Sequence, residues 1–186
     1  MNDPKGHIIV ISPVGDVDTL VVSRIGREIR RIFGYEIETH LLLKDLEFAF
    51  DLDRGQYHST AILQALAAIA PSRALKVLAI VDVDLFIPIL THVYGEAQLG
   101  GQACIVSSCR LKEGLSPAGI LEGLTRRLVK ESVHELGHTF NLRHCKDPAC
   151  IMHYCRTVKD VDRKSNELCR YCTILLGDEI DRLHER

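Results

Sequence analysis

Residues 134–145, HELGHTFNLRHC, concentrate side chains that bind transition metals. His134 and His138 are four residues apart, so on a helix both imidazoles project from one face and reach the same ion. Glu135 lies about 100° around such a helix from His134, where a carboxylate acts as a base beside the metal rather than as a ligand. A catalytic zinc takes three protein ligands and leaves a fourth position open, and His144 is the third candidate ligand.

The competing interpretation of this stretch is a solvated helix face with incidental histidines, because H-E-x-x-H alone arises by chance in unrelated chains. His144 follows the second histidine at a distance of six residues and favours a metal site, provided that the chain reverses after Phe140. The residues beyond His144 favour a metal site further.

Four cysteines in the last quarter of the sequence form a second metal-binding pattern. They are Cys145, Cys150, Cys169 and Cys172. Their spacing, C-x4-C and then C-x2-C, is close to that of structural zinc sites. Four thiolates fill the coordination shell of zinc, so this site is expected to hold structure rather than perform chemistry. The alternative is a set of buried or disulfide-paired thiols, which the odd total of seven cysteines disfavours.

The two sites meet at one peptide bond, between His144 and Cys145, so we predict that they are mechanically coupled. Positioning Cys145 on its own zinc also restrains the adjacent histidine. The remaining cysteines, Cys104, Cys109 and Cys155, are expected to be buried small apolar residues. For Cys155 the alternative is competition for the second zinc.

The helix that carries the first two histidines is predicted to begin at Ser116 and Pro117 and to run through His138. Serine caps a helix start, and proline fits the first turn because its missing N–H is not needed there. An apolar stripe runs along this helix, and the histidines project roughly 150° away from it. The stripe comprises Val129, Val133, Leu136 and Phe140.

The first half of the chain alternates between predicted strands and helices. Continuous apolar runs indicate buried strands, and helical spacing of apolar residues indicates the helices between them. The predicted strands are residues 7–12, 35–43 and 75–87, followed by an edge strand in 93–101 and a further strand in 103–111. The predicted helices are one capped by Asp18 and ended by Gly34, one over residues 59–70, and a last one that carries Cys172, Leu175, Leu176, Ile180 and Leu183.

These elements predict an α/β (α+β) fold with a single compact domain over residues 1–186 and a twisted mixed sheet. The first part, residues 1–144, holds the sheet and the active-site helix. The second part, residues 145–186, is a small C-terminal subdomain stapled by the four-cysteine zinc.

Composition and charge exclude several classes of function. Apolar residues make up 46% and charged residues 26%, and the net charge is −2, which is ordinary for a globular domain. The sequence has no long basic block of the kind that binds nucleic acid, and no stretch has the length of a membrane span. Residues 1–15 lack a basic leader and a cleavage site. We therefore expect a cytoplasmic protein with reduced thiols, and a monomer.

The sequence resembles one metallopeptidase family. HELGHTFNLRH is similar to the extended zinc-binding stretch of metzincins, H-E-x-x-H-x-x-G-x-x-H, and Met152 resembles the methionine of their Met-turn. The run H-C-x4-C-x-M followed by C-x-x-C is specific to the archaemetzincin branch. VYGEAQLGG and DVDRK, residues 160–164, also look familial, and the likeness covers roughly residues 93–176. One position departs from the family: Asn141 replaces a glycine that turns the chain in a left-handed conformation, at a cost of about 1 kcal/mol.

The resemblance implies a zinc-dependent metallopeptidase that hydrolyses peptide bonds by a zinc-activated water with Glu135 as general base. It implies two Zn²⁺ per chain, one catalytic and one structural. It also implies that Met152 forms an apolar floor under the histidines and that residues 93–101 receive an extended peptide or protein substrate. Tyr154 is a candidate oxyanion stabiliser, the alternative being an ordinary packed tyrosine.

Two other functions remain open at this point. One is a zinc amidohydrolase that acts on a non-peptide amide. The other is a metal-stabilised peptide-binding protein with little or no turnover, which Asn141 makes more credible because it loosens the placement of His144.

Overall fold

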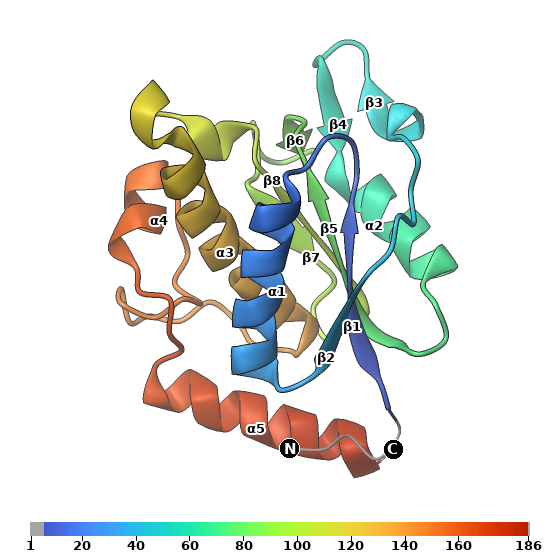
Figure 1. Cartoon of the computed structure of the whole chain (residues 1–186), viewed down its shortest axis with the longest axis vertical. Helices are drawn as coiled ribbons and strands as arrows, with labels where there is room; N and C mark the ends of the chain where they lie inside the picture. The colour runs from blue at the N-terminus through green and yellow to red at the C-terminus, as the bar shows by residue number, and fades with distance from the viewer. Residues whose placement is uncertain (1–5, 186) are drawn as a thin grey trace.

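A five-stranded sheet in the order β2-β1-β5-β8-β7 forms the centre of this computed structural model, which describes residues 6–185 (Figure 1). The first four of these strands pair in parallel, and β7 pairs antiparallel with β8 at the edge. The predicted α/β fold with a mixed sheet is therefore confirmed. Residues 1–5, the beginning of the segment inspected for a leader, lie outside the described residues. The strands are β1 (Ile8–Pro13), β2 (Glu36–Thr39), β3 (Phe50–Asp51), β4 (Gln56–His58), β5 (Ala74–Val81), β6 (Leu85–Phe86), β7 (Gly95–Ala97) and β8 (Ala103–Ser107).

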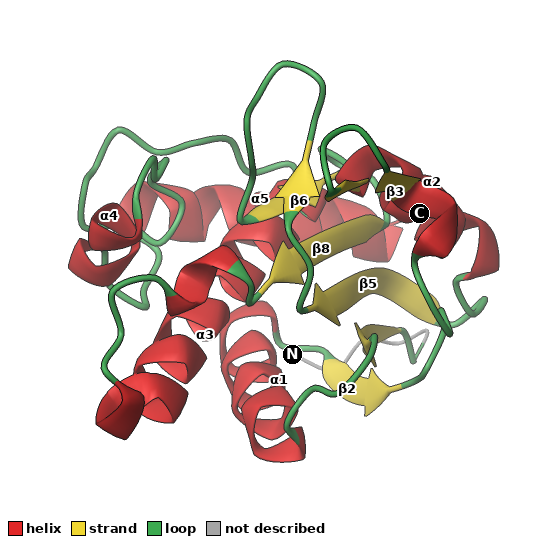
Figure 2. Ribbon diagram, turned by 90° about the horizontal axis from the view of Figure 1, so that it is seen from above, coloured by secondary structure: helices red, strands yellow, loops and turns green. Residues whose placement is uncertain are grey.

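Helices cover both faces of this sheet and bury two hydrophobic cores (Figures 1 and 2). Apolar residues of α1, α3 and α5 share one core with alternate residues of β1, β5 and β8, and α2 packs on the other face. No helix within residues 6–185 is both long enough and apolar enough to cross a bilayer. The α-helices are α1 (Thr19–Phe33), α2 (Ser59–Ile69), α3 (Ile120–Thr139), α4 (Val158–Arg163) and α5 (Arg170–Glu185), and the 3-10 turns are Glu47–Ala49, Arg110–Lys112 and Pro117–Gly119.

Local signals predicted α1 well. The Asp18 carboxylate accepts a hydrogen bond from the Leu20 N–H at 2.7 Å, and Gly34 ends the helix with a left-handed φ of 80°. The start of α3 was predicted wrongly, because Ser116 forms no side-chain cap. Residues 117–119 instead make a 3-10 turn, and α3 begins at Ile120.

Two predicted strands are shorter than expected. β2 ends at Thr39: the His40 N–H still donates to the Ile11 carbonyl, but the Leu42 N–H donates to the Ser12 hydroxyl instead of to a backbone carbonyl of β1. The strand predicted over residues 75–87 breaks after Val81. Asp82 and Asp84 form ion pairs with Lys112 and Arg110 there, and the chain leaves the main sheet. Residues 85–86 then pair with β4 in a second, three-stranded sheet.

A buried lysine joins three elements around the end of α3. Lys76 of β5 is 4% exposed, and its ammonium donates 2.7 Å hydrogen bonds to the carbonyl oxygens of Thr139 and Gly101. It also lies 4.9 Å above the centre of the Phe140 ring. A cation at a helix C-terminus is favourable, because it satisfies terminal carbonyl groups and opposes the helix dipole. Burial nevertheless lowers the pKa of Lys76 to about 8.

We expect Lys76→Met to change the pH dependence of stability. The folded pKa, about 8, lies below the ordinary value of 10.5, so between these values unfolding takes up a proton at Lys76 and rising pH favours the folded wild type. The free energy of unfolding of the wild type minus that of the variant should therefore increase by up to about 3 kcal/mol across this window. Denaturant titrations at pH 7.5, 9 and 10.5 measure it. Parallel pH profiles for the two proteins would contradict the prediction.

Candidate metal centre

The three candidate histidine ligands converge beside the C-terminal half of α3. Their ligand atoms all lie within 4.8 Å of one another. The Nδ1 atoms of His134 and His138 face the carbonyl oxygens of Ile151 and Leu142, at 2.9 and 2.7 Å. Each Nδ1 therefore carries the proton, and the unprotonated Nε2 is left to bind a metal. The two Nε2 atoms are 3.2 Å apart, close to the roughly 3.3 Å between two nitrogen ligands of a tetrahedral zinc.

The chain reverses after α3 through a left-handed residue. Asn141 has φ 62°, and among the described residues it is the one non-glycine residue with a positive φ. The Asn141 N–H donates to the His138 carbonyl at 2.9 Å, and the Leu142 N–H donates to the Gly137 carbonyl at 3.0 Å. These are the two bonds of a Schellman motif with asparagine in the position usually held by glycine. The turn brings His144 back towards the helix, with its ring centre 4.8 Å from that of His138.

Neighbouring groups keep the histidines neutral. Burial, assisted by the charge of Lys164, lowers the pKa of His134 well below its usual value. Burial also lowers the pKa of His138 to about 4. Neutral imidazole is the form that binds metals, so the site holds its ligands in the required state at neutral pH.

Glu135 lies between α3 and the edge strand β7. Burial raises the pKa of this carboxyl well above its usual value, and the neighbouring charges of Glu131 and Glu96 act in the same direction. Gly95 of β7 makes room for it: a Cβ added at Gly95 would come within 2.6 Å of Glu135 Cγ and 2.5 Å of the Ile105 carbonyl oxygen. A side chain at residue 95 would therefore displace the carboxylate or separate β7 from β8.

The face of α3 that carries the histidines is buried. The histidines point away from the apolar stripe, and His134 and Glu135 are 5% and 7% exposed, respectively. The strand β7 and the chain after residue 145 cover this side of the helix. This burial excludes the interpretation as a solvated helix face. Buried polar side chains also require hydrogen-bonding or charged partners to offset the loss of water.

Met152 lies under the helix next to the histidines. It is fully buried, and its sulfur would be 2.5 Å from a Cβ added at Gly137, so glycine at that position permits the contact. The Met152 carbonyl accepts a hydrogen bond from the Cys145 N–H at 2.9 Å. This bond connects the segment that holds Met152 to the residue that follows His144.

A buried ion pair beside the histidines was missed by sequence reasoning. Lys164 is fully buried at its side chain, and its Nζ lies 2.7 Å from Glu131 Oε1 and 3.5 Å from His134 Nδ1. Glu131 is one helical turn before Glu135. In the sequence, the run DVDRK, which contains Lys164, shows only a family likeness. The four-residue spacing between Glu131 and Glu135 is the signal that places Glu131 on the same helix face as the site.

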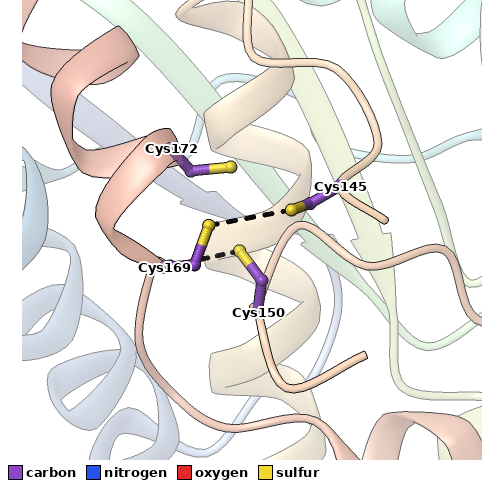
Figure 3. A group of neighbouring side chains, drawn as sticks. All are labelled: Cys145, Cys150, Cys169 and Cys172. Atoms are coloured by element: carbon purple, nitrogen blue, oxygen red, sulfur yellow. Dashed lines mark hydrogen bonds between the residues drawn. The ribbon is translucent and has the colours of Figure 1, made fainter. Parts of the chain in front are cut away.

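The four cysteines predicted to bind zinc also converge (Figure 3). Their sulfur atoms all lie within 4.8 Å of one another. Cys145 and Cys169 have sulfurs 3.7 Å apart, which fits two ligands of a tetrahedral zinc and is far beyond the roughly 2.05 Å of a disulfide. The Cys169 N–H donates to the Cys150 sulfur at 3.3 Å. Since Cys172 belongs to the first turn of α5, the cluster connects this helix to the loop after α3.

The other cysteines lie outside this cluster. Cys104 is fully buried, as expected, but Cys109 and Cys155 are only partly buried. Cys155 lines the cavity beside the histidines, and burial raises its pKa to about 11. It does not belong to the group of cysteines whose sulfur atoms lie within 4.8 Å of one another, so competition for the second metal has no support.

A cavity of about 680 Å³ opens onto the histidines and Glu135. Tyr154 forms part of its wall, is 45% exposed and has its ring centre 4.9 Å from that of His144. It is therefore not an ordinary packed tyrosine. Residues 93–97 and 99, which include all of β7, form another part of the wall.

Comparisons with known proteins identify the family. The model of peptidase family M54 matches residues 26–178. The archaemetzincin of Methanocaldococcus jannaschii is 34% identical over 91% of this chain and 93% of its own. The crystal structure of archaemetzincin from Methanopyrus kandleri superposes with a TM-score of 0.83 at 34% identity, over 95% of this chain and 97% of the other. The Archaeoglobus fulgidus archaemetzincin complexed with malonate gives 0.76 at 29% identity, over 90% and 99% of the two chains.

The resemblance noted from the sequence is therefore confirmed across nearly the whole chain, including the N-terminal half that carries no motif. The chain belongs to peptidase family M54, the archaemetzincins, and is a zinc metallopeptidase.

Proposed function

We propose that this metallopeptidase hydrolyses peptide bonds, with Glu135 as the general base and a catalytic zinc held by His134, His138 and His144. A second, structural zinc is held by the four cysteines shown in Figure 3. The observation that carries the proposal is the pair of Nε2 atoms 3.2 Å apart, next to a buried carboxylate in an open cavity. With the ring protons on Nδ1, facing Ile151 and Leu142, each of these Nε2 atoms offers a lone pair to a shared metal ion.

Each residue of the site has a separate role in the proposed hydrolysis. Zinc bound by the histidines would act as a Lewis acid that acidifies water and polarises the scissile carbonyl. Glu135 takes a proton from the attacking water and delivers it to the leaving amine, for which its raised pKa is suited. Gly95 leaves the space that this carboxylate occupies. The Tyr154 hydroxyl donates a hydrogen bond to the oxyanion as charge develops there.

An extended peptide fits the edge of the sheet. Among the described strands β7 pairs with β8 alone, so its other edge offers backbone N–H and C=O groups to an added strand. Because Gly95 of this strand lies against Glu135, a peptide paired there passes directly over the base and the histidines.

The two other functions considered from the sequence lose their main support. Asn141 had made a non-catalytic binding protein credible, but its left-handed turn brings His144 to the other two histidines. Hydrolysis of a non-peptide amide uses the same residues, and the free edge of β7 favours a peptide over a small amide.

We also propose a monomer in the cytoplasm. All seven cysteines are free thiols, which agrees with a reducing compartment, and four of them are arranged for a metal rather than for disulfides.

Replacing Glu135 with glutamine should reduce peptide hydrolysis by about 10²- to 10⁴-fold, because the amide cannot accept the proton. Zinc content should stay at the wild-type value, since Glu135 is not a ligand. A panel of fluorogenic peptides and acyl amides measures the loss. Glu122→Gln on the same helix is the matched control, because its exposed ion pair with Arg24 is worth little. Undiminished hydrolysis by the Glu135 variant would rule out this mechanism.

Metal analysis of the wild type should find about two zinc ions per chain, one for each cluster. We expect Cys169→Ser to lose the structural zinc and also to weaken zinc at the histidines, because Cys145 then no longer restrains His144. Chelator competition followed by metal analysis measures both affinities, and Cys109→Ser is the control. An unchanged affinity at the histidine site would show that the two sites are independent.

The substitution Gly95→Ala should reduce kcat/KM by about 10²-fold, since it displaces Glu135 by the clash described above. Gly177→Ala is the matched control: a Cβ there has no neighbour within 4 Å, and alanine is favourable in a helix. Steady-state kinetics and zinc content are compared for the two variants. Normal kinetics for Gly95→Ala would contradict the placement of Glu135 against β7.

A further inference from the structure

The acidic groups in the wall of the catalytic cavity are largely engaged. Three glutamates line it: Glu96, Glu131 and Glu135. Glu131 is paired with the buried Lys164. Glu96 accepts hydrogen bonds from the hydroxyl groups of Thr60, at 2.8 Å, and Ser59. Glu135 is therefore the one carboxylate of this wall without a charged or hydroxyl partner within residues 6–185, and it faces the metal ligands.

Two arginines in the same wall have no such partners. Arg143 directly precedes His144, and Arg156 follows Tyr154 by two residues; both are exposed and line the cavity. Neither forms an ion pair or a side-chain hydrogen bond within residues 6–185. Most of the other arginines in the described part of the chain do form ion pairs, among them Arg24, Arg110 and Arg127. The cavity thus presents two guanidinium groups that pair with no carboxylate of residues 6–185.

The position of these arginines relates them to the reaction site. In the sequence they lie within two residues of His144 and Tyr154, whose ring centres are 4.9 Å apart, and all four residues line the same cavity. Another part of the wall is apolar and includes Ile87, Leu90 and Val93. A ligand that matches this cavity therefore carries an apolar group and a negative charge beside the scissile bond.

We propose that Arg143 and Arg156 bind a carboxylate of the peptide substrate and so make the enzyme selective for acidic peptides. The guanidinium group binds a carboxylate through two parallel hydrogen bonds, which provide geometric specificity as well as attraction. This proposal rests on the proposed peptidase function. The carboxylate belongs either to an aspartate or glutamate side chain or to the free C-terminus of a short peptide.

Four versions of each peptide in a set of short internally quenched peptides distinguish these sources. They carry either Glu or Gln at one position near the scissile bond, and either a free or an amidated C-terminus. The wild type should cleave the preferred acidic version with a kcat/KM about tenfold higher than that of its neutral counterpart. The neutral peptide lacks one charge-assisted hydrogen-bonded pair with the arginines. A preference for Glu over Gln assigns the side chain, and a preference for the free acid over the amide assigns the C-terminus.

Arg143→Gln and Arg156→Gln should each reduce this preference, and the double variant should abolish it, because the acidic versions lose more kcat/KM than the uncharged Gln amide does. Arg126→Gln is the matched control, because Arg126 is exposed, does not line the cavity and has no ion pair with any residue from 6 to 185. Equal cleavage of all four versions by the wild type, or equal losses on all four versions in the variants, would overturn the proposal.

A binding measurement separates this proposal from the peptidase function itself. Glu135→Gln should bind the acidic version about tenfold more tightly than the neutral one, and adding Arg143→Gln and Arg156→Gln should remove the difference. If the wild type cleaves no peptide, the peptidase proposal fails while this comparison still tests the arginines. Equal binding of the two versions by Glu135→Gln would overturn the arginine proposal alone.

Discussion

The left-handed turn at Asn141 is the constraint on which both metal clusters depend. Its two hydrogen bonds back to Gly137 and His138 close the end of α3, whose last residue is Thr139, and reverse the chain. Three residues later His144 joins the other histidines, and the next residue, Cys145, joins the other cysteines. The Leu142 carbonyl oxygen in the same turn also accepts a hydrogen bond from His138 Nδ1 at 2.7 Å. One turn therefore orients a ligand on the helix and places a ligand beyond it.

Several contacts secure this end of α3 from the sheet side. The Gly100 N–H, in the loop between β7 and β8, donates to the His138 carbonyl at 2.9 Å. Lys76 holds the next carbonyl, that of Thr139, from the middle of β5. The loop after the edge strand β7 and the end of the helix thus share anchors, so this edge of the sheet and the candidate metal ligands keep one relative position. Preorganisation of this kind is what lets a site stabilise a transition state without reorganising at the moment of reaction.

Sequence reasoning succeeded where a local rule decides the structure. The Asp18 cap, the Gly34 end of α1 and the clustered metal ligands all follow from residue type and spacing. It failed where a distant partner decides. Asp82 and Asp84 interrupt a run of apolar residues, and only their pairing with Lys112 and Arg110 in space ends β5. Lys76 and Lys164 are buried, although lysine is almost never fully buried without partners, and those partners lie 63 and 33 residues away in the sequence, at Thr139 and Glu131.

The Nε2 lone pairs of His134 and His138 repel each other, and this repulsion links the histidine site to the stability of the fold. Burial keeps His134 and His138 neutral, and carbonyl groups fix their protons on Nδ1, so two acceptor lone pairs face each other at 3.2 Å. Protonation cannot relieve this repulsion at neutral pH, because burial and the charge of Lys164 both oppose a further positive charge on His134. A divalent cation would relieve this repulsion because both lone pairs would coordinate it. Several coordination bonds together would offset the desolvation penalty of burying the ion. Metal binding by these histidines would therefore also stabilise α3, the turn at Asn141 and the loop that follows it.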